Sequence, residues 1–294
     1  MDDIIAFHTP TLDDRQWIGE LLDGASFMNC EYGFGNMLLW AESFGTMVGR
    51  YKNFLLMRSS DAYLLPIGNQ APTQAIEYLI DCARKNGEEL KFVNVTKPMR
   101  EFLEKIFPEK FEFVENRAFA DYIYSVEDLT TLSGKKYHKK RNHLSNFKKR
   151  YSWSFEEITS SNLQECFEMY EVWLRNKNAE NDENYEEYSA VKMAFDNFDK
   201  LGFIGGALRV DGKIEAFTMG EALTEETFCT HIEKANTNIV GAYAAINNEF
   251  AKNCLKSYKY VNREEDMGIE GLRKAKLSYY PVILLEKDKA ILRG

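Results

Sequence analysis

No apolar run in the sequence approaches the roughly 20 residues that a helix needs to span a bilayer. Proline is scarce, with 6 residues, and no tract is rich in glycine and serine, which argues against a floppy tether between domains. The first residues, MDDIIAFHTP, lack the basic end and the apolar core of a signal peptide. These absences together predict a globular protein of the cytoplasm.

Cysteine is also sparse and without a pattern. The 5 cysteines are scattered along the chain, odd in number, and form no CxxC pair. Such a set fits a reduced cytoplasm and does not fit a cysteine-rich zinc site. His231 lies two residues from Glu233 on a predicted strand, but the sequence indicates no third ligand beside them. We therefore expect no metal site.

Apolar residues are abundant enough for a sizeable core. The 294 residues are 45% hydrophobic and 14% aromatic, as in well-packed globular proteins, and the length suits two domains of ordinary size. The formal net charge is -9. An acidic protein is not a general binder of polyanions, so an anionic ligand would have to be captured by a local basic patch.

One basic patch lies at residues 134–153, GKKYHKKRNHLSNFKKRYSW. From Lys135 to Arg150 the sequence holds eight Lys or Arg and no Asp or Glu. On a helix its apolar side chains fall on one narrow face, with Lys140 among them and Arg141 at the edge. A lysine on a docked face must reach water or meet an anion. The alternative is a solvated basic helix that links two domains.

Strands and helices alternate on both sides of this patch, which predicts an α/β (α+β) fold. In the first part we expect strands at 53–59 and 91–95, and helices at 73–86 and 97–107. In the second part, the turn Asp211-Gly212 predicts a hairpin over 202–223. A strand at 226–236, a helix from near Val240 and a strand from 259 follow the hairpin.

The order of elements in the second part resembles the acyltransferase fold of the GNAT superfamily. Three stretches, 120–149, 227–252 and 261–281, together resemble a bacterial family related to the C-terminal domain of phosphatidylglycerol lysyltransferase. The resemblance implies two tandem GNAT-like acyltransferase domains, as in lysyltransferases and Fem peptidoglycan aminoacyltransferases. The expected domains are residues 1–130, a basic junction helix at 131–153, and residues 154–294, which would carry the acyl-donor site.

The acyltransferase resemblance places a donor site where the helix near Val240 begins. The free N–H groups of a helix N-terminus favour a pyrophosphate, so we expect coenzyme A or acyl-CoA as co-substrate there. The stretch NTNIVGAY departs from the common Q/R-x-x-G-x-G/A loop because it has one glycine, and an ordinary capped helix is the alternative. The expected donor-binding residues are Ala235, Asn236, Thr237, Asn238, Val240, Gly241, Ala242, Lys140 and Arg141.

Acyl transfer to an amine needs a base and a means to stabilise an oxyanion. Glu233, on the strand before the helix, is the expected base for this reaction, although a solvent-facing strand carboxylate with no catalytic role is the simpler interpretation. Tyr279 or Tyr280 would protonate a departing thiolate. By resemblance, Lys276 would lie near the transferred acyl ester. Asp266 or Glu265 would bind the cationic amine of the acceptor, and each of these side chains has a purely structural alternative.

Three functions remain open from the sequence. The first is an N-acyltransferase that moves an acyl group from acyl-CoA to a small-molecule or peptide amine. The second is an aminoacyltransferase that takes its donor from tRNA, with salt-sensitive tRNA binding through residues 135–150. The third is a non-catalytic module that binds an anion. The acyl group, the acceptor, a catalytic role for the N-terminal domain and the oligomeric state stay undetermined.

Overall fold

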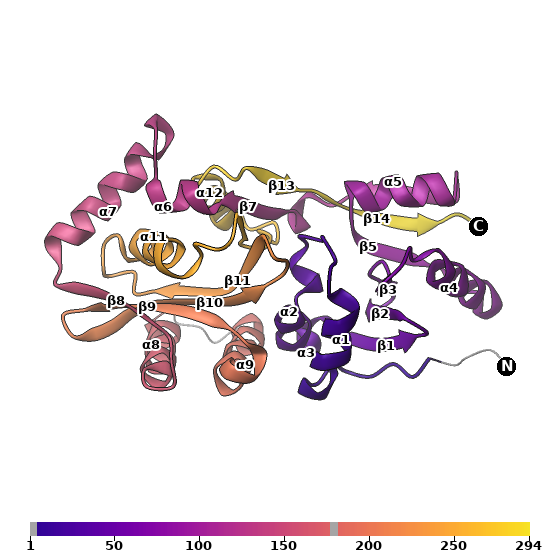
Figure 1. Ribbon diagram of the computed structural model, residues 1–294, viewed down its shortest axis with the longest axis horizontal. Coiled ribbons are helices and arrows are strands. Elements are labelled where there is room, and N and C mark those ends of the chain that lie inside the picture. The colour runs from indigo at the N-terminus through magenta and orange to yellow at the C-terminus, as the bar shows by residue number, and fades with distance from the viewer. Residues whose placement is uncertain (1–4, 177–181) are drawn as a thin grey trace. The chain divides into compact units, whose positions relative to one another are not determined.

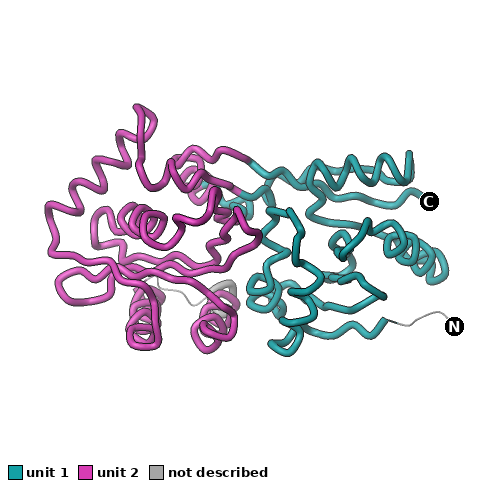
Figure 2. The backbone as a smooth tube through the Cα atoms, in the orientation of Figure 1, with its two compact units in different colours: residues 1–121, 265–270, 284–294 teal, residues 122–264, 271–283 magenta. Residues whose placement is uncertain are grey.

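The computed structural model describes residues 5–176 and 182–294 and confirms the α/β class, with two mixed sheets flanked by helices. The chain forms two compact units that are not consecutive in sequence (Figure 2). The first unit comprises residues 1–121, 265–270 and 284–294, and the second comprises residues 122–264 and 271–283. The expected domain boundaries at residues 130 and 153 place the C-terminal strand in the second domain. In the structure this strand, β14 (Lys287–Leu292), belongs to the first unit.

The sheet of the first unit has the strand order β1-β2-β3-β5-β14-β6, with β4 paired to β2. The helix expected at 73–86 is confirmed as α4, whose Ile76, Leu79 and Ile80 are buried and which ends at Gly87 in the left-handed conformation. The elements are η1 (Leu12–Asp14), α1 (Arg15–Leu22), η2 (Cys30–Tyr32), α2 (Phe34–Leu39), α3 (Ala41–Phe44), β1 (Thr46–Tyr51), β2 (Phe54–Ser59), β3 (Ala62–Tyr63), β4 (Ile67–Gly68), α4 (Thr73–Asn86), β5 (Lys91–Thr96), α5 (Lys97–Ile106), β6 (Phe111–Glu115), η3 (Arg117–Phe119) and β14 (Lys287–Leu292).

The second sheet has the order β13-β7-β12-β11-β10-β9-β8. In the second unit, α11 covers one face of this sheet, and α8 and α9 cover the other (Figure 1). The predicted hairpin is confirmed, because β9 and β10 flank Asp211 and Gly212. The elements are β7 (Asp121–Ser125), α6 (Val126–Thr131), η4 (Lys135–Tyr137), α7 (His138–Arg150), β8 (Trp153–Glu157), α8 (Leu163–Asn176), α9 (Asp182–Asp196), α10 (Phe198–Leu201), β9 (Ile204–Val210), β10 (Lys213–Ala222), β11 (Thr227–Ala235), α11 (Ala242–Cys254), β12 (Tyr260–Asn262), α12 (Glu270–Leu277) and β13 (Ile283–Leu285).

The basic segment forms η4 and α7 and has the two faces that its sequence predicts. Tyr137 and Phe147 are fully buried, and Phe147 packs in one apolar cluster with the first turns of α11. Lys136, Lys139, Lys149 and Arg150 are exposed, whereas Lys140, Arg141 and Lys148 are half-buried. Among the described residues, no helix combines the length and the apolar character that crossing a membrane requires.

Candidate active site

Two parallel strands of the second unit stop pairing at the candidate site. Thr227–Cys229 of β11 align with Tyr260–Asn262 of β12, after which β12 ends and β11 continues to Ala235. Glu233 lies on this continuation and Arg263 follows β12 directly. The Arg263 guanidinium donates to Oε1 of Glu233 at 2.6 Å, and the two side chains are only 15% and 11% exposed. A largely buried ion pair therefore occupies the point where the strands diverge.

Lys140 of α7 adds a second cation to this ion pair. Its Nζ lies 3.6 Å from the ring centroid of Tyr279, and the Arg263 guanidinium lies 5.3 Å from the same ring. Burial, together with the positive charge of Arg263, lowers the pKa of Lys140 to about 8. Burial also raises the pKa of Tyr279 to about 12, so the phenol keeps its proton at neutral pH. The site thus combines one carboxylate, two basic groups and a neutral phenol.

Lys276, Asp266 and Arg141 have surroundings that differ from the expected ones. Lys276 donates to the backbone carbonyls of Arg263 and Glu264, so it fixes the segment after β12 rather than an acyl ester. Asp266 belongs to the first unit, is fully buried, and accepts from the Gly268 N–H at 2.8 Å, which does not fit capture of a diffusible amine. The Arg141 guanidinium donates to backbone carbonyls just before α7.

The expected donor loop, residues 235–242, is closely packed against α7. Gly241 has φ 89°, and a Cβ on it would lie 2.9 Å from the carbonyl oxygen of His143 and 3.0 Å from Cβ of Phe147. Five of the seven backbone N–H groups in residues 236–242 already donate within the protein. These bonds run from Asn236 to Glu215 O, from Asn238 to Asn236 Oδ1, from Ile239 to Asn236 O, from Val240 to Tyr151 Oη and from Ala242 to Ile239 O.

A cavity of about 560 Å³ lies beside this loop in the second unit. Asn236 and Thr237 of the loop line it, together with residues of α8 and of the turn between β9 and β10. Three carboxylates take part in the lining, from Glu165, Glu168 and Glu215. Lys213 also lines the cavity, and Glu165 is paired with Arg209. The carboxylates still outnumber these cations, so the lining suits a cationic ligand better than an anionic one.

His231 has more partners than the sequence indicated, and the reason for discounting a metal there was wrong. Its Nδ1 lies 2.8 Å from Oε1 of Glu264 and 3.7 Å from Sγ of Cys229, while Nε2 lies 3.0 Å from Oε1 of Glu221. Burial acts to lower the pKa of His231, but Cys229 and the two carboxylates outweigh it and hold that pKa well above its usual range.

Sequence reasoning also missed Arg263. The expected acceptor-binding residues Asp266 and Glu265 lie in the charge-dense run NREED, and Arg263 of the same run is not among the expected site residues. The available signal was its position, because Arg263 directly follows a short buried strand. A basic side chain at that position needs a nearby carboxylate, and Glu233 on the neighbouring strand supplies it.

Comparison with known proteins decides the family. Residues 25–287 match the family described as phosphatidylglycerol lysyltransferase, C-terminal. The chain belongs to this family. A conserved protein of unknown function from Bacteroides thetaiotaomicron VPI-5482 is 42% identical to this family member, and its crystal structure has a TM-score of 0.92 over 99% of this chain and 100% of that one. No curated protein sequence matches the chain.

Two more distant structures share the fold of this lysyltransferase-family chain. L-PGS from Bacillus licheniformis is 14% identical, with a TM-score of 0.63 over 94% of this chain and 90% of that one. FemX is 9% identical, with a TM-score of 0.58 over 96% of both chains. At these identities the likeness extends to the fold alone.

Proposed function

We propose that the protein is an acyltransferase of the lysyltransferase or Fem type, which moves an aminoacyl group from tRNA to an amine. The observation that carries the proposal is the buried pair of Glu233 and Arg263, with Lys140 beside it, where β11 and β12 diverge. Acyl transfer needs a base for the proton of the amine and positive charge for the oxyanion, and these three groups supply both. Membership of the family supports the same reaction class.

In the proposed reaction, the acceptor first releases its ammonium proton to solvent, and the neutral amine nitrogen then attacks the carbonyl carbon of the aminoacyl ester. Glu233 takes a proton from that nitrogen, directly or through one water, while Arg263 and Lys140 stabilise the negative charge on the carbonyl oxygen. The ester bond then breaks, and the departing ribose oxygen takes up a proton. Tyr279 has this proton to give, because its pKa of about 12 keeps the phenol neutral. The proton that Glu233 took then returns to Tyr279 through water, which restores both groups.

The choice of tRNA as donor rests on the loop before α11 and on the outer face of α7. Most N–H groups of residues 236–242 already have acceptors, which leaves few for the pyrophosphate of coenzyme A. The exposed bases Lys136, Lys139 and Lys149 suit a longer polyanion that follows a surface. Acyl-CoA remains the alternative donor, and a cytoplasmic location would give access to either.

The acceptor is proposed to be a cationic amine that binds in the acidic cavity beside Asn236. Carboxylates of Glu165, Glu168 and Glu215 line that cavity and would attract an ammonium group. Tyr243 of α11 also lines the cavity, and burial raises the pKa of its phenol.

The test compares the two donors on one preparation. Bulk tRNA charged with labelled amino acids, and separately labelled acetyl-CoA, are incubated with the protein and a mixture of amines. We expect label to move from tRNA to amine, and the exchange Glu233→Gln to stop this transfer without loss of tRNA binding. Neutralising Lys136, Lys139 and Arg150 together should weaken tRNA binding in a salt-dependent manner, unlike a matched change of Lys85, Lys105 and Lys110.

Each of the other outcomes would contradict a different part of the proposal. Transfer from acetyl-CoA alone would replace the tRNA donor with acyl-CoA. Binding of tRNA with no transfer from either donor would indicate a non-catalytic anion-binding module. Normal transfer by the Glu233→Gln variant would remove Glu233 from the mechanism.

A further inference from the structure

Strand β11 has an irregularity that places His231 in a special position. Thr230 is aligned with Gly220 of β10 and Ile232 with Met219, so His231 is an extra residue with no partner in the register. Such a bulge turns the side chain of the extra residue away from its regular direction. A Cβ on Gly220 would lie only 1.8 Å from the carbonyl oxygen of Cys229, so the glycine permits the close approach of the strands.

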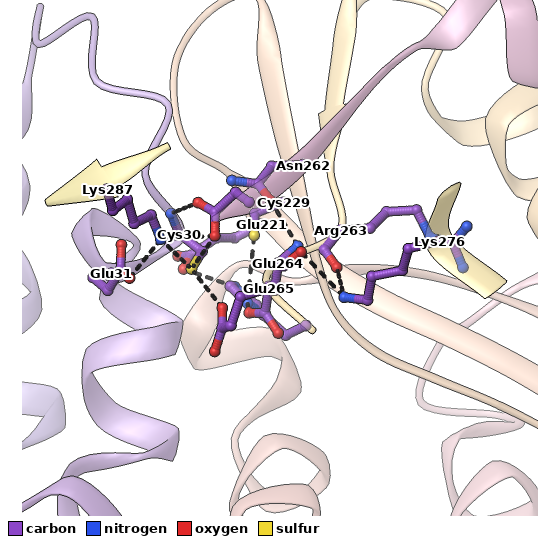
Figure 3. A network of polar contacts seen from close by, with 12 residues as sticks. Cys30, Glu31, Glu221, Cys229, Asn262, Arg263, Glu264, Glu265, Lys276 and Lys287 are labelled. Carbon is purple, nitrogen blue, oxygen red and sulfur yellow. Dashed lines mark hydrogen bonds and ion pairs between the residues drawn. The ribbon is translucent and has the colours of Figure 1, made fainter. Parts of the chain in front are cut away.

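The two ring nitrogens of His231 have different surroundings. On one side, Nδ1 meets a carboxylate oxygen of Glu264 at 2.8 Å and the sulfur of Cys229 at 3.7 Å. On the other side, Nε2 meets the carboxylate of Glu221 at 3.0 Å. The imidazole is fully buried, and the donor atoms of Cys229, His231 and Glu264 all lie within 4.8 Å of one another. Figure 3 shows Cys229, Glu221 and Glu264 gathered in this group.

We propose that Cys229 Sγ, His231 Nδ1 and the Glu264 carboxylate bind one divalent transition-metal ion of the zinc type. Thiolate, imidazole and carboxylate are the three protein ligands that zinc accepts, and a tetrahedral ion would hold its sulfur and nitrogen ligands about 3.5 Å apart. The 3.7 Å between Sγ and Nδ1 is close to this value. The carboxylate of Glu264 would retreat from Nδ1 by roughly half an ångström to share the ion.

Glu221 completes the arrangement from the far side of the ring. A histidine that binds a metal through one nitrogen usually donates its other N–H to a carboxylate, which fixes the tautomer and orients the ring. The 3.0 Å contact between Nε2 and Glu221 has this geometry. On metal binding, the Cys229 thiol and Nδ1 of His231 would each lose a proton to solvent, so that a thiolate and a neutral imidazole ligate the ion.

A second group with similar donor atoms is not suited to binding a metal ion. Cys30, Asp121 and Glu265 of the first unit also bring their ligand atoms within 4.8 Å. There, the ammonium of Lys287 lies 2.7 Å from Oδ1 of Asp121 and 3.7 Å from Sγ of Cys30. The Lys287 ammonium would repel a metal ion and is not itself one of the three donors, whereas His231 becomes a ligand once it gives up its Nδ1 proton, so the proposal is confined to the His231 group.

The metal would act on the backbone that carries Arg263. Glu264 has φ 58°, in the left-handed region that non-glycine residues rarely adopt, and its carbonyl is held by Lys276. The left-handed φ and the hydrogen bond from Lys276 already constrain this turn, and a bond from the Glu264 carboxylate to the ion would constrain it further. The ion is therefore expected to position Arg263 rather than to touch a substrate, and three protein ligands leave its fourth position for water.

The experiment measures metal directly, so its result is independent of any transferase activity. The full chain is expressed with added Zn²⁺, and its metal content is measured by elemental mass spectrometry. The metal is then removed with a chelator, and the protein is titrated with Co²⁺. We expect about one zinc per chain, and a thiolate-to-cobalt charge-transfer band in the near ultraviolet. Cys229→Ser should abolish the band and the bound zinc, whereas Cys166→Ser, which changes another buried cysteine of the same unit, should retain both.

A wild-type protein that holds no zinc after supplementation, and gives no cobalt band, would overturn the proposal and leave His231 as a buried hydrogen-bonded group. A band that survives Cys229→Ser would also overturn it. Where Cys229→Ser does not fold, Glu264→Gln serves instead, because it keeps the thiolate band but should weaken Co²⁺ affinity by about tenfold or more. Unchanged affinity in that variant would remove Glu264 from the site.

Discussion

Each compact unit buries one cluster in which a basic side chain meets carboxylates and a thiol. In the first unit the base is Lys287, whose Nζ lies 2.6 Å from Oε1 of Glu31 and 2.7 Å from Oδ1 of Asp121 (Figure 3). In the second unit the base is His231, between Glu221 and Glu264. In both, carboxylates removed from water must find a positive partner inside the protein.

The two bases differ in what they can do besides neutralise charge. Burial acts to lower the pKa of Lys287, but Asp121, Cys30 and Glu31 outweigh it and keep that pKa well above its usual range. An ammonium has three donors and no lone pair, so its cluster is a fixed ion network. The imidazolium of His231 can release its Nδ1 proton when a metal ion competes for that nitrogen, and it then offers a lone pair, so its cluster can bind a metal. The Lys287 cluster therefore contributes stability, whereas the His231 cluster can also bind a ligand.

The largest expected effect is the loss of stability on Lys287→Met. This change leaves Glu31 and Asp121 buried without their cation, which should cost about 3–5 kcal/mol of unfolding free energy in urea titrations. Lys289→Met, on the same strand but partly exposed, is the control and should cost far less. Adding Glu31→Gln to Lys287→Met should recover part of the loss. A Lys287→Met protein of wild-type stability would show that the cluster is not held by its lysine.

The second expected effect separates chemistry from stability. Glu233→Gln should lower kcat of the proposed transfer by about 10²–10⁴-fold, because the base is lost, with little change in donor affinity. Glu31→Gln in the first unit should leave kcat unchanged, since its carboxylate neutralises Lys287. Single-turnover kinetics with labelled donor would measure both. Equal losses of kcat in the two variants would contradict a catalytic role for Glu233 and a purely structural role for Glu31.

A smaller effect is expected from Gly220→Ala. The new Cβ would collide with the backbone of Cys229 at the bulge, and we expect a cost of about 1–3 kcal/mol. Gly19→Ala in α1 meets nothing within 4 Å and should instead stabilise the first unit by about 0.5–1 kcal/mol. Thermal unfolding of both variants tests the requirement for glycine. A tolerated alanine at position 220 would show that the bulge can relax.

The smallest effect concerns Lys140, a half-buried lysine whose pKa is moved in the opposite direction to that of Lys287. Its folded pKa of about 8 is below the ordinary 10.5, so the unfolded chain binds more protons between these values. This group therefore destabilises the fold below pH 8, and the penalty fades as pH rises toward 10.5. Lys140→Met should be more stable than wild type at pH 7, and the difference should shrink by pH 10. A constant difference across this range in thermal melts would contradict the shifted pKa.

Several features of the fold follow from the sequence alone because they depend on local periodicity. The 3.6-residue period of α7 placed Phe147 inward and Lys149 outward, and it placed Lys140 on the docked face. The Asp211-Gly212 turn predicted the hairpin. Glu233 could be proposed as a base because it lies near the end of a recognisable strand, and the structure puts Arg263 and Lys140 beside it.

Other features were decided only by tertiary structure, because they depend on which distant segments pair. The return of β14 to the first sheet places Lys287 beside Asp121, 166 residues away in the chain, and no local pattern encodes that pairing. The partners of His231 come from β10, β11 and the turn after β12, and a one-residue bulge aims the ring at them. Side-chain period and charge determine which residues must be buried. The register of strands far apart in sequence determines which of those residues meet, and here it makes one buried cluster a fixed ion network and the other a candidate metal site.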